Sequence, residues 1–200
     1  PALYVALLMA LFAALFGTRQ VDATEHHHGM MAALALESVV KLVALVAVGL
    51  VSWQWLSARD QPLGEAARTL FESQPPAGFL TQTLLGFLAI LCLPRQFQVA
   101  VVECGDVGDV RRARWMFGAY LVIISLMVVP IATAGVELFG GHGAQAGDTF
   151  VLALPLAIGQ DKLAMAAYIG GFSAATGMVI VASIALATMI SNDLVMPILL

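Results

Sequence analysis

Charged side chains are scarce in this sequence. Lys and Arg together number 9 and Asp and Glu 13 among 200 residues, which is 11% of the chain, whereas a soluble domain carries about 25%. The net charge of −4 at pH 7 lacks the basic excess of a protein that binds nucleic acid. The composition therefore argues against an ordinary soluble domain and against a nucleic-acid partner.

Cysteine and the local motifs of catalysis are also lacking. The 2 cysteines, Cys92 and Cys104, are too few for a disulfide framework or a zinc motif. The adjacent histidines 26–28 would point in different directions around a helix start, so they cannot form one compact metal site. Without a phosphate-binding loop or a nucleophile elbow, we expect no enzymatic reaction, no metal centre and no cofactor within this chain.

Apolar residues, by contrast, make up 60% of the chain, and the mean hydropathy is +0.92. A run of about 20 apolar residues spans a bilayer as a helix, because lipid offers no partner for an exposed backbone amide. We therefore predict an all-α membrane protein, with residues 1–200 as part of one transmembrane domain truncated at both ends. The predicted helices are 1–16, 29–55, 78–102, 115–139 and 160–190, with a short amphipathic piece at 64–73 and a short surface or re-entrant helix at 148–158.

The loops between these helices predict an orientation. Lys and Arg are enriched on the cytoplasmic side of membrane proteins. Five arginines fall on one side of the predicted helices and three basic residues on the other, which makes the first side cytoplasmic. The first set is Arg19, Arg95, Arg111, Arg112 and Arg114, and the second is Arg59, Arg68 and Lys162.

Two ionisable residues lie inside the second predicted helix. Glu37 and Lys41 are four residues apart with the carboxylate first, the favourable order for a helical pair. Ionisable groups at membrane depth are costly and by default indicate function. A self-neutralising structural pair and a functional pair are both open interpretations.

The third predicted helix contains Gly86 and then Pro94 and Gln96. A proline removes a backbone hydrogen bond and breaks or kinks a helix, and transporters build binding sites at broken helices. These three residues are candidates for a substrate pathway; a helix that simply ends near Pro94 at the membrane surface is the alternative.

Small residues fill positions 170–177 of the last predicted helix. They let membrane helices pack closely, while backbone and hydroxyl oxygens at such a helix can coordinate a hard cation such as sodium. Plain packing and an ion site are both open at this point. The candidate ion ligands are Ser173, Ala174, Thr176 and Gly177.

Several segments resemble the sodium:solute symporter family, which includes the sodium/proline and sodium/glucose transporters. They are Leu93-Pro94-Arg95-Gln96-Phe97, the basic stretch 109–115, and Ser191-Asn192-Asp193-Leu194 after the small-residue helix. With 17–25 and 171–193, the chain is most similar to the transporter-like N-terminal membrane domain of certain bacterial sensor histidine kinases. The resemblance implies core helices four to eight of a leucine-transporter-like inverted-repeat bundle, located in the bacterial inner membrane.

In one respect the chain departs from that family. The transporters of that family bind sodium partly through two consecutive residues with hydroxyl side chains on core helix eight. Counted back from Asp193, this pair falls on Gly177 and Met178, and Ser173 and Thr176 lie nearby but out of register. Sodium is therefore only a candidate coupling ion, and the backbone oxygen of Ala174 is one ligand it could retain.

The resemblance leaves two functions open. One is cation-coupled transport of a small solute, such as an amino acid or a carboxylate, by alternating access. The other is a solute-sensing module of a histidine kinase without net transport, in which binding biases two states of an attached cytoplasmic kinase domain. Membrane lipid and a small solute are the expected partners in both.

Overall fold

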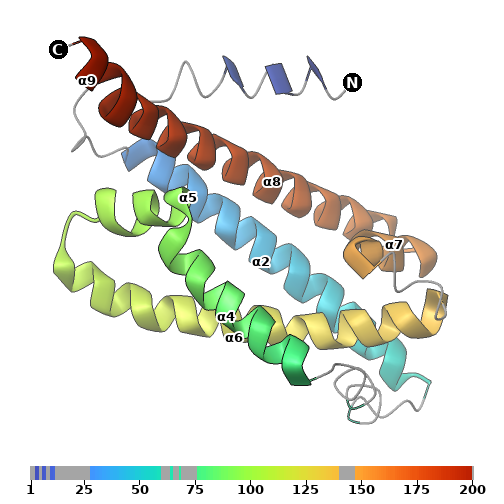
Figure 1. Cartoon of the computed structure of the whole chain (residues 1–200). Helices are drawn as coiled ribbons and strands as arrows, with labels where there is room; N and C mark the ends of the chain where they lie inside the picture. Colours follow the sequence, from blue (N-terminus) through green and yellow to red (C-terminus); the bar gives the residue numbers. More distant parts are fainter. Residues whose placement is uncertain are drawn as a thin grey trace.

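The computed structural model of the chain describes residues 28–59, 76–139 and 147–199, with single residues within 3–11 and at 64 and 68. Most of the predicted helix 1–16, most of the amphipathic piece 64–73, and His26 and His27 lie outside the described residues. All regular structure in the described ranges is helical (Figure 1). The elements are α2 (His28–Ser57), α4 (Pro76–Cys92), α5 (Pro94–Phe97), the π-helix η1 (Gln98–Val102), α6 (Val107–Phe139), α7 (Phe150–Ala157), α8 (Asp161–Ile190), the π-helix η3 (Ser191–Val195) and α9 (Met196–Leu199).

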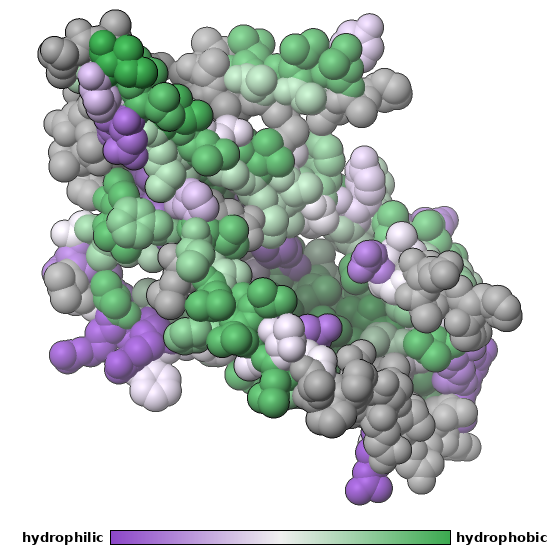
Figure 2. Space-filling model, viewed as in Figure 1, coloured by the Kyte–Doolittle hydropathy of each residue, from purple (hydrophilic) through white to green (hydrophobic). Residues whose placement is uncertain are grey.

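In the part of the chain that the structure describes, three helical stretches are long and apolar enough to cross a membrane. They are Met31–Ser57, Gly108–Phe139 and Asp161–Ile198, while α4 is a shorter apolar helix. Figure 2 shows hydrophobic side chains over much of one face of the molecule, as expected where a surface meets lipid rather than water. The all-helical architecture is confirmed for the described residues, and the three long apolar helices are compatible with the predicted membrane helical bundle.

Helix α2 lies between α6 and α8 and packs against both. Helices α2 and α6 run in the same direction, and α8 runs in the opposite one (Figure 1). Val48, Ile131, Phe150 and Ala167 come together from α2, α6, α7 and α8 in one buried cluster. The apolar core of the described region therefore lies where the short helix α7 closes over the other three.

The buried residues of α8 mostly follow the spacing of a single helix face, which repeats every three or four residues. Most of them are small, which allows the backbones of α8 and its neighbours to approach closely. They are Ala164, Ala167, Gly170, Gly177, Val181, Ile184 and Ala185. The small-residue stretch predicted from the sequence is thus a packing seam.

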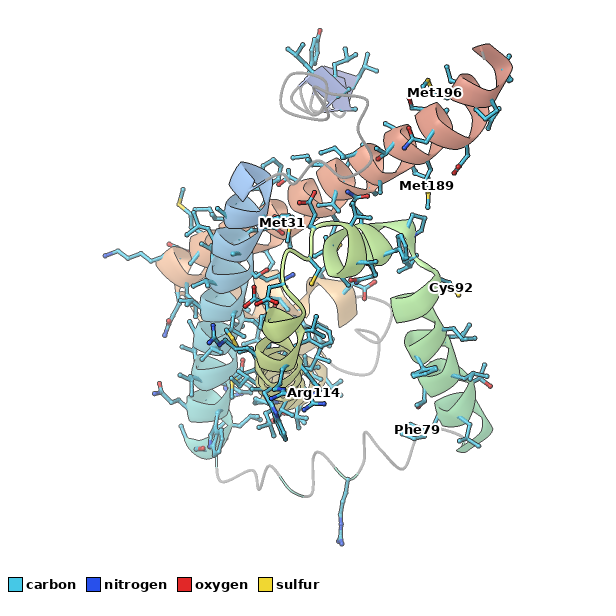
Figure 3. All side chains as sticks on the ribbon, turned by 90° about the vertical axis from the view of Figure 1, so that its left-hand side faces the viewer. Met31, Phe79, Cys92, Arg114, Met189 and Met196 are labelled. Carbon is cyan, nitrogen blue, oxygen red and sulfur yellow. The ribbon has the colours of Figure 1, made fainter. Side chains whose placement is uncertain are left out.

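The break predicted at Pro94 is present. Helix α4 ends at Cys92, Leu93 is not helical, and α5 begins at Pro94. In Figure 3, α4 stands to one side between the labels of Phe79 and Cys92, and the chain turns sharply after Cys92. Among the described elements α4 packs closely only on α5, whereas α5 also packs on α8. A short helical segment follows the break, and both interpretations of Pro94, a broken helix and a helix that ends at the membrane surface, stay predictions.

The predicted boundaries lie within two residues of the observed ones except at the start of α6 and after Ile190, where the helical stretch continues as η3 and α9 to Leu199. The sequence predicts a charged loop through 114 and a helix from 115, but α6 begins at Val107 and includes the exposed residues Asp109, Arg111, Arg112 and Arg114. A helix does not need to end where its apolar run ends, because exposed charged residues also form helical turns with good propensity. The short helix predicted at 148–158 and the last helix predicted at 160–190 correspond to α7 and α8.

Candidate functional site

The carboxylate of Glu37 on α2 lies directly against Gly177 on α8. A methyl group built on Gly177 would collide with the carboxylate carbon and both carboxylate oxygens of Glu37. Gly177 is buried and Glu37 is half-buried. The missing side chain of Gly177 therefore forms a notch that holds an acidic group between two helices long and apolar enough to cross a membrane.

A second close contact fixes how the two helices pass each other. A methyl group on Gly170 would lie 2.9 Å from the Cβ atom of Ala44 and 3.6 Å from the Cα atom of Lys41. Since Gly170 lies at the level of Lys41 and Ala44 while Gly177 lies at the level of Glu37, α2 and α8 are antiparallel here. Lys41, one turn along α2, is also half-buried and interacts electrostatically with the Glu37 carboxylate.

The candidate ion ligands lie on α8 between or beside these two contacts. Ser173 and Ala174 precede Gly177 by four and three residues, so they share its face of the helix. Ser173, Ala174 and Thr176 are all half-buried. The Thr176 hydroxyl donates a 2.8 Å hydrogen bond to the Ser173 carbonyl oxygen. That bond satisfies the hydroxyl proton within α8 and leaves the lone pairs of Thr176 Oγ1 available as acceptors.

The residues predicted for a substrate pathway do not stay together. Gly86 is exposed on α4, and a methyl group built on it would meet no atom within 4 Å. Pro94 and Gln96 are both half-buried on α5, the segment that packs on α8. The structure therefore brings Pro94 and Gln96 toward the helix that carries the notch and leaves Gly86 on a separate helix.

One further polar residue was not singled out from the sequence. Gln98 opens the π-helix η1 and is buried. π-helical turns often occur at functional sites, and η1 continues directly from α5. A glutamine two residues after Gln96 in an otherwise apolar stretch is the signal that could have identified it.

At this site the structure brings into contact two features that were predicted separately, on two different helices. The sequence indicates a charged pair, Glu37 and Lys41, on one helix and, on another, a small-residue stretch around Gly177 for which packing and an ion site were both open. The structure places the Glu37 carboxylate directly against Gly177 on α8. An acidic group from α2 thus occupies space that the missing side chain at 177 leaves open.

Chemically, this arrangement puts the Glu37 carboxylate oxygens against α8, and the Thr176 hydroxyl oxygen belongs to the residue next to Gly177 on that helix. Within the described ranges, no group of three or more His, Cys, Asp or Glu side chains is placed to hold a metal ion. The donors suit a single positive charge, because only one of them is acidic. In comparisons with known proteins, no family model, no curated protein and no solved structure matches this chain.

Proposed function

We propose that this chain is part of a membrane domain that couples a cation to the transport of a small solute, such as an amino acid or a carboxylate. The proposed architecture is a sodium:solute symporter-like inverted-repeat bundle attached to a sensor histidine kinase. The observation that carries the transport proposal is the Glu37 carboxylate in the Gly177 notch of α8. An acidic group at the interface of two spanning helices is costly in lipid, and such groups mark ion pathways in membrane proteins.

Two features of the arrangement support alternating access. The long helices cross in both directions, with α2 and α6 parallel and α8 antiparallel to them (Figure 1). The helix interrupted at Leu93 resumes as α5 against α8. Broken helices next to a close-packed helix are the elements from which transporters of this kind build their binding sites.

Uptake by the full-length protein in proteoliposomes tests this proposal. We expect at least one radiolabelled amino acid or carboxylate to accumulate only when an inward sodium or proton gradient is imposed. The Glu37→Gln variant should lose this accumulation, whereas Glu137→Gln, which changes an exposed carboxylate near the end of α6, should retain it.

The sensing alternative predicts a different result in the same experiment. Solute would bind to the protein, as measured by a shift in thermal stability, without accumulating in the liposomes under either gradient. Failure of every tested solute both to bind and to accumulate would contradict the transport proposal and the sensing alternative together.

A further inference from the structure

The first turns of α6 carry three arginines, Arg111, Arg112 and Arg114, whose side chains are all exposed. Figure 2 shows a hydrophilic patch where α6 begins, next to hydrophobic side chains. We propose that Arg111 and Arg114, together with the ring of Trp115, form a binding site for the headgroup of an anionic phospholipid. This lipid site is separate from the Gly177 notch and does not depend on the proposed transport function.

The length of α6 places these arginines at the level of lipid headgroups. The helix has 33 residues, which extend over about 50 Å at 1.5 Å per residue, whereas the hydrocarbon core of a bilayer is about 30 Å thick. Part of α6 therefore has to lie outside the hydrocarbon. The start of the helix is the part that does so, because the only charged residue after Arg114 is Glu137 near the other end. Trp115 follows at once, and tryptophan is enriched at the boundary between lipid and water.

The exposed side of α6 runs from the arginines into the apolar part of the helix. Arg114 lies three residues after Arg111, so the two guanidinium groups share one face. The exposed residues that follow on this face at helical spacing are Trp115, Gly118, Val122 and Leu126. A methyl group built on Gly118 would meet no atom within 4 Å. Acyl chains therefore have access to a strip of α6 that begins at the two arginines.

Arg112 and Asp109 lie toward other sides of the helix. Arg112 is two residues before Arg114, which places it about 160° away around the helix axis. Asp109 lies five turns before Met127 on the same side of α6, and the Met127 side chain lies against Gly49 of α2. These two residues thus belong to the sides of α6 nearer α2, which makes Arg112 a matched control for the two lipid-facing arginines.

The guanidinium groups of Arg111 and Arg114 are available for an external anion. Neither of them pairs with a carboxylate within the ranges that the structure describes. The carboxylate of Asp106 instead accepts a 3.1 Å hydrogen bond from the backbone N–H of Gly108, at the start of α6. The positive charge of this face is therefore not neutralised by the neighbouring acidic residue.

The chemistry of the face suits a phosphate group that carries acyl chains. Guanidinium groups donate paired hydrogen bonds to phosphate oxygens. The Cζ atom of Arg114 lies 5.7 Å from the centre of the Trp115 ring, a distance at which the cation and the ring attract each other. A zwitterionic headgroup brings its own cation beside its phosphate, which two guanidinium groups repel, so a net negative headgroup is favoured. The sequence predicts this side as cytoplasmic, and anionic lipids of the cytoplasmic leaflet attract basic residues next to a spanning helix.

Quenching of tryptophan fluorescence by brominated phospholipids measures which lipids lie next to Trp115. The full-length protein is reconstituted in phosphatidylcholine vesicles that contain either brominated phosphatidylglycerol or brominated phosphatidylcholine. The signal of Trp115 is the difference between each protein and the same protein with Trp115→Phe. We expect the binding constant of phosphatidylglycerol to exceed that of phosphatidylcholine. The ratio of the two constants should fall about fivefold in Arg111→Gln and about fivefold in Arg114→Gln, the contribution of one basic residue at an anionic surface.

The control variant removes the same charge from another side of the helix. Arg112→Gln should retain most of the preference for phosphatidylglycerol. A loss as large as in Arg111→Gln and Arg114→Gln would overturn the proposal, because it would show diffuse attraction by the whole basic segment rather than a site on one face.

The unaltered protein also tests the proposal without any arginine variant. Equal quenching of Trp115 by the two brominated lipids would overturn it, and an acidic protein segment bound to this face would give that result. Inorganic phosphate added to the vesicles should not displace the brominated phosphatidylglycerol, and displacement would show a site for free phosphate instead. Because the assay needs no solute, its result is independent of whether the protein transports one.

Discussion

Two of the close contacts that helix α2 makes through glycine differ in the side chain that they accommodate. Against α6, the glycine is Gly49, and a methyl group there would lie 2.8 Å from the sulfur of Met127 and 3.0 Å from its Cβ atom. Against α8, the glycine is Gly177, and the group in its notch is the Glu37 carboxylate. A thioether is flexible and apolar, so it fills a gap at little cost. A carboxylate in a membrane span is expensive, so close packing alone accounts for the first contact but not for the second.

The two contacts also lie at different positions along α2. Gly49 lies next to Val48, which belongs to the buried cluster formed by α2, α6, α7 and α8. Glu37 lies in the N-terminal part of α2, outside that cluster. The molecule thus has an apolar core at one end of α2 and a polar contact toward the other. An interface that must open and close is better placed away from the core, where fewer buried apolar contacts resist local opening.

The largest stability effect is expected from Gly177→Ala. The added methyl group collides with the Glu37 carboxylate, and overpacking of this kind costs about 1–3 kcal/mol. Thermal unfolding in detergent, followed by the fluorescence of the tryptophans, measures it. Gly171→Ala on the same helix is the matched control: its methyl group meets open space, so it should be neutral or stabilising by less than about 1 kcal/mol. Equal effects of the two variants would contradict the notch.

A smaller effect is expected from the charged pair. Glu37→Gln and Lys41→Met should each lower the thermal stability, because each leaves one half-buried charge without its partner. The double variant should recover part of the loss, with a coupling of about 0.5–1 kcal/mol for a pair that is not fully buried. Strictly additive losses would show that the two side chains do not interact.

Thr176→Val tests whether the polar contact includes a hydroxyl oxygen. If Thr176 Oγ1 accepts a hydrogen bond from the bound species or from water next to it, its loss removes about 0.5–1.5 kcal/mol of binding, which is a weakening of solute affinity of about 2- to 12-fold. Thr83→Val is the control, since Thr83 is an exposed threonine on α4 with the same intrahelical type of hydrogen bond, 2.8 Å long, to the Phe79 carbonyl oxygen. An unchanged cation dependence in Thr176→Val would remove this residue from the site.

The smallest effect is expected from Gly49→Ala on the apolar side of the comparison. The Met127 side chain can adopt another rotamer to accommodate the methyl group, since methionine has several rotatable bonds. The gain in helix propensity from glycine to alanine, about 0.5–1 kcal/mol, offsets the cost of repacking. The unfolding temperature should therefore change much less than in Gly177→Ala. A loss as large as that of Gly177→Ala would show that the α2–α6 contact is equally tight.

The sequence predicted the elements well because apolar length alone determines which segments can span a bilayer. The predicted ranges of α2 and α8 differ from the observed ones by one or two residues. The start of α6 was missed, since charged residues such as Arg112 can belong either to a loop or to a helical turn beyond the apolar run. The break at Leu93 was predicted because Pro94 lacks a backbone N–H.

The sequence predicted the two residues of the site separately, but not their contact. Glu37 stood out as a charge in an apolar helix, and Gly177 stood out by counting along a family pattern. Their contact could not be derived, since helical periodicity gives the face of each helix but not which helix packs against it. Only the level at which α2 crosses α8 puts the carboxylate opposite Gly177, and that level depends on the whole α2, α6, α7 and α8 packing.

A double-mutant cycle between Glu37→Ala and Gly177→Ala tests the central contact most directly. In the wild-type background, Gly177→Ala places a methyl group where the carboxylate lies; in the Glu37→Ala background, that space is empty. Thermal unfolding of the four proteins should show that the cost of Gly177→Ala largely disappears once Glu37 is alanine, with an interaction energy of about 1 kcal/mol or more. The same cost in both backgrounds would show that the Glu37 carboxylate does not occupy the Gly177 notch.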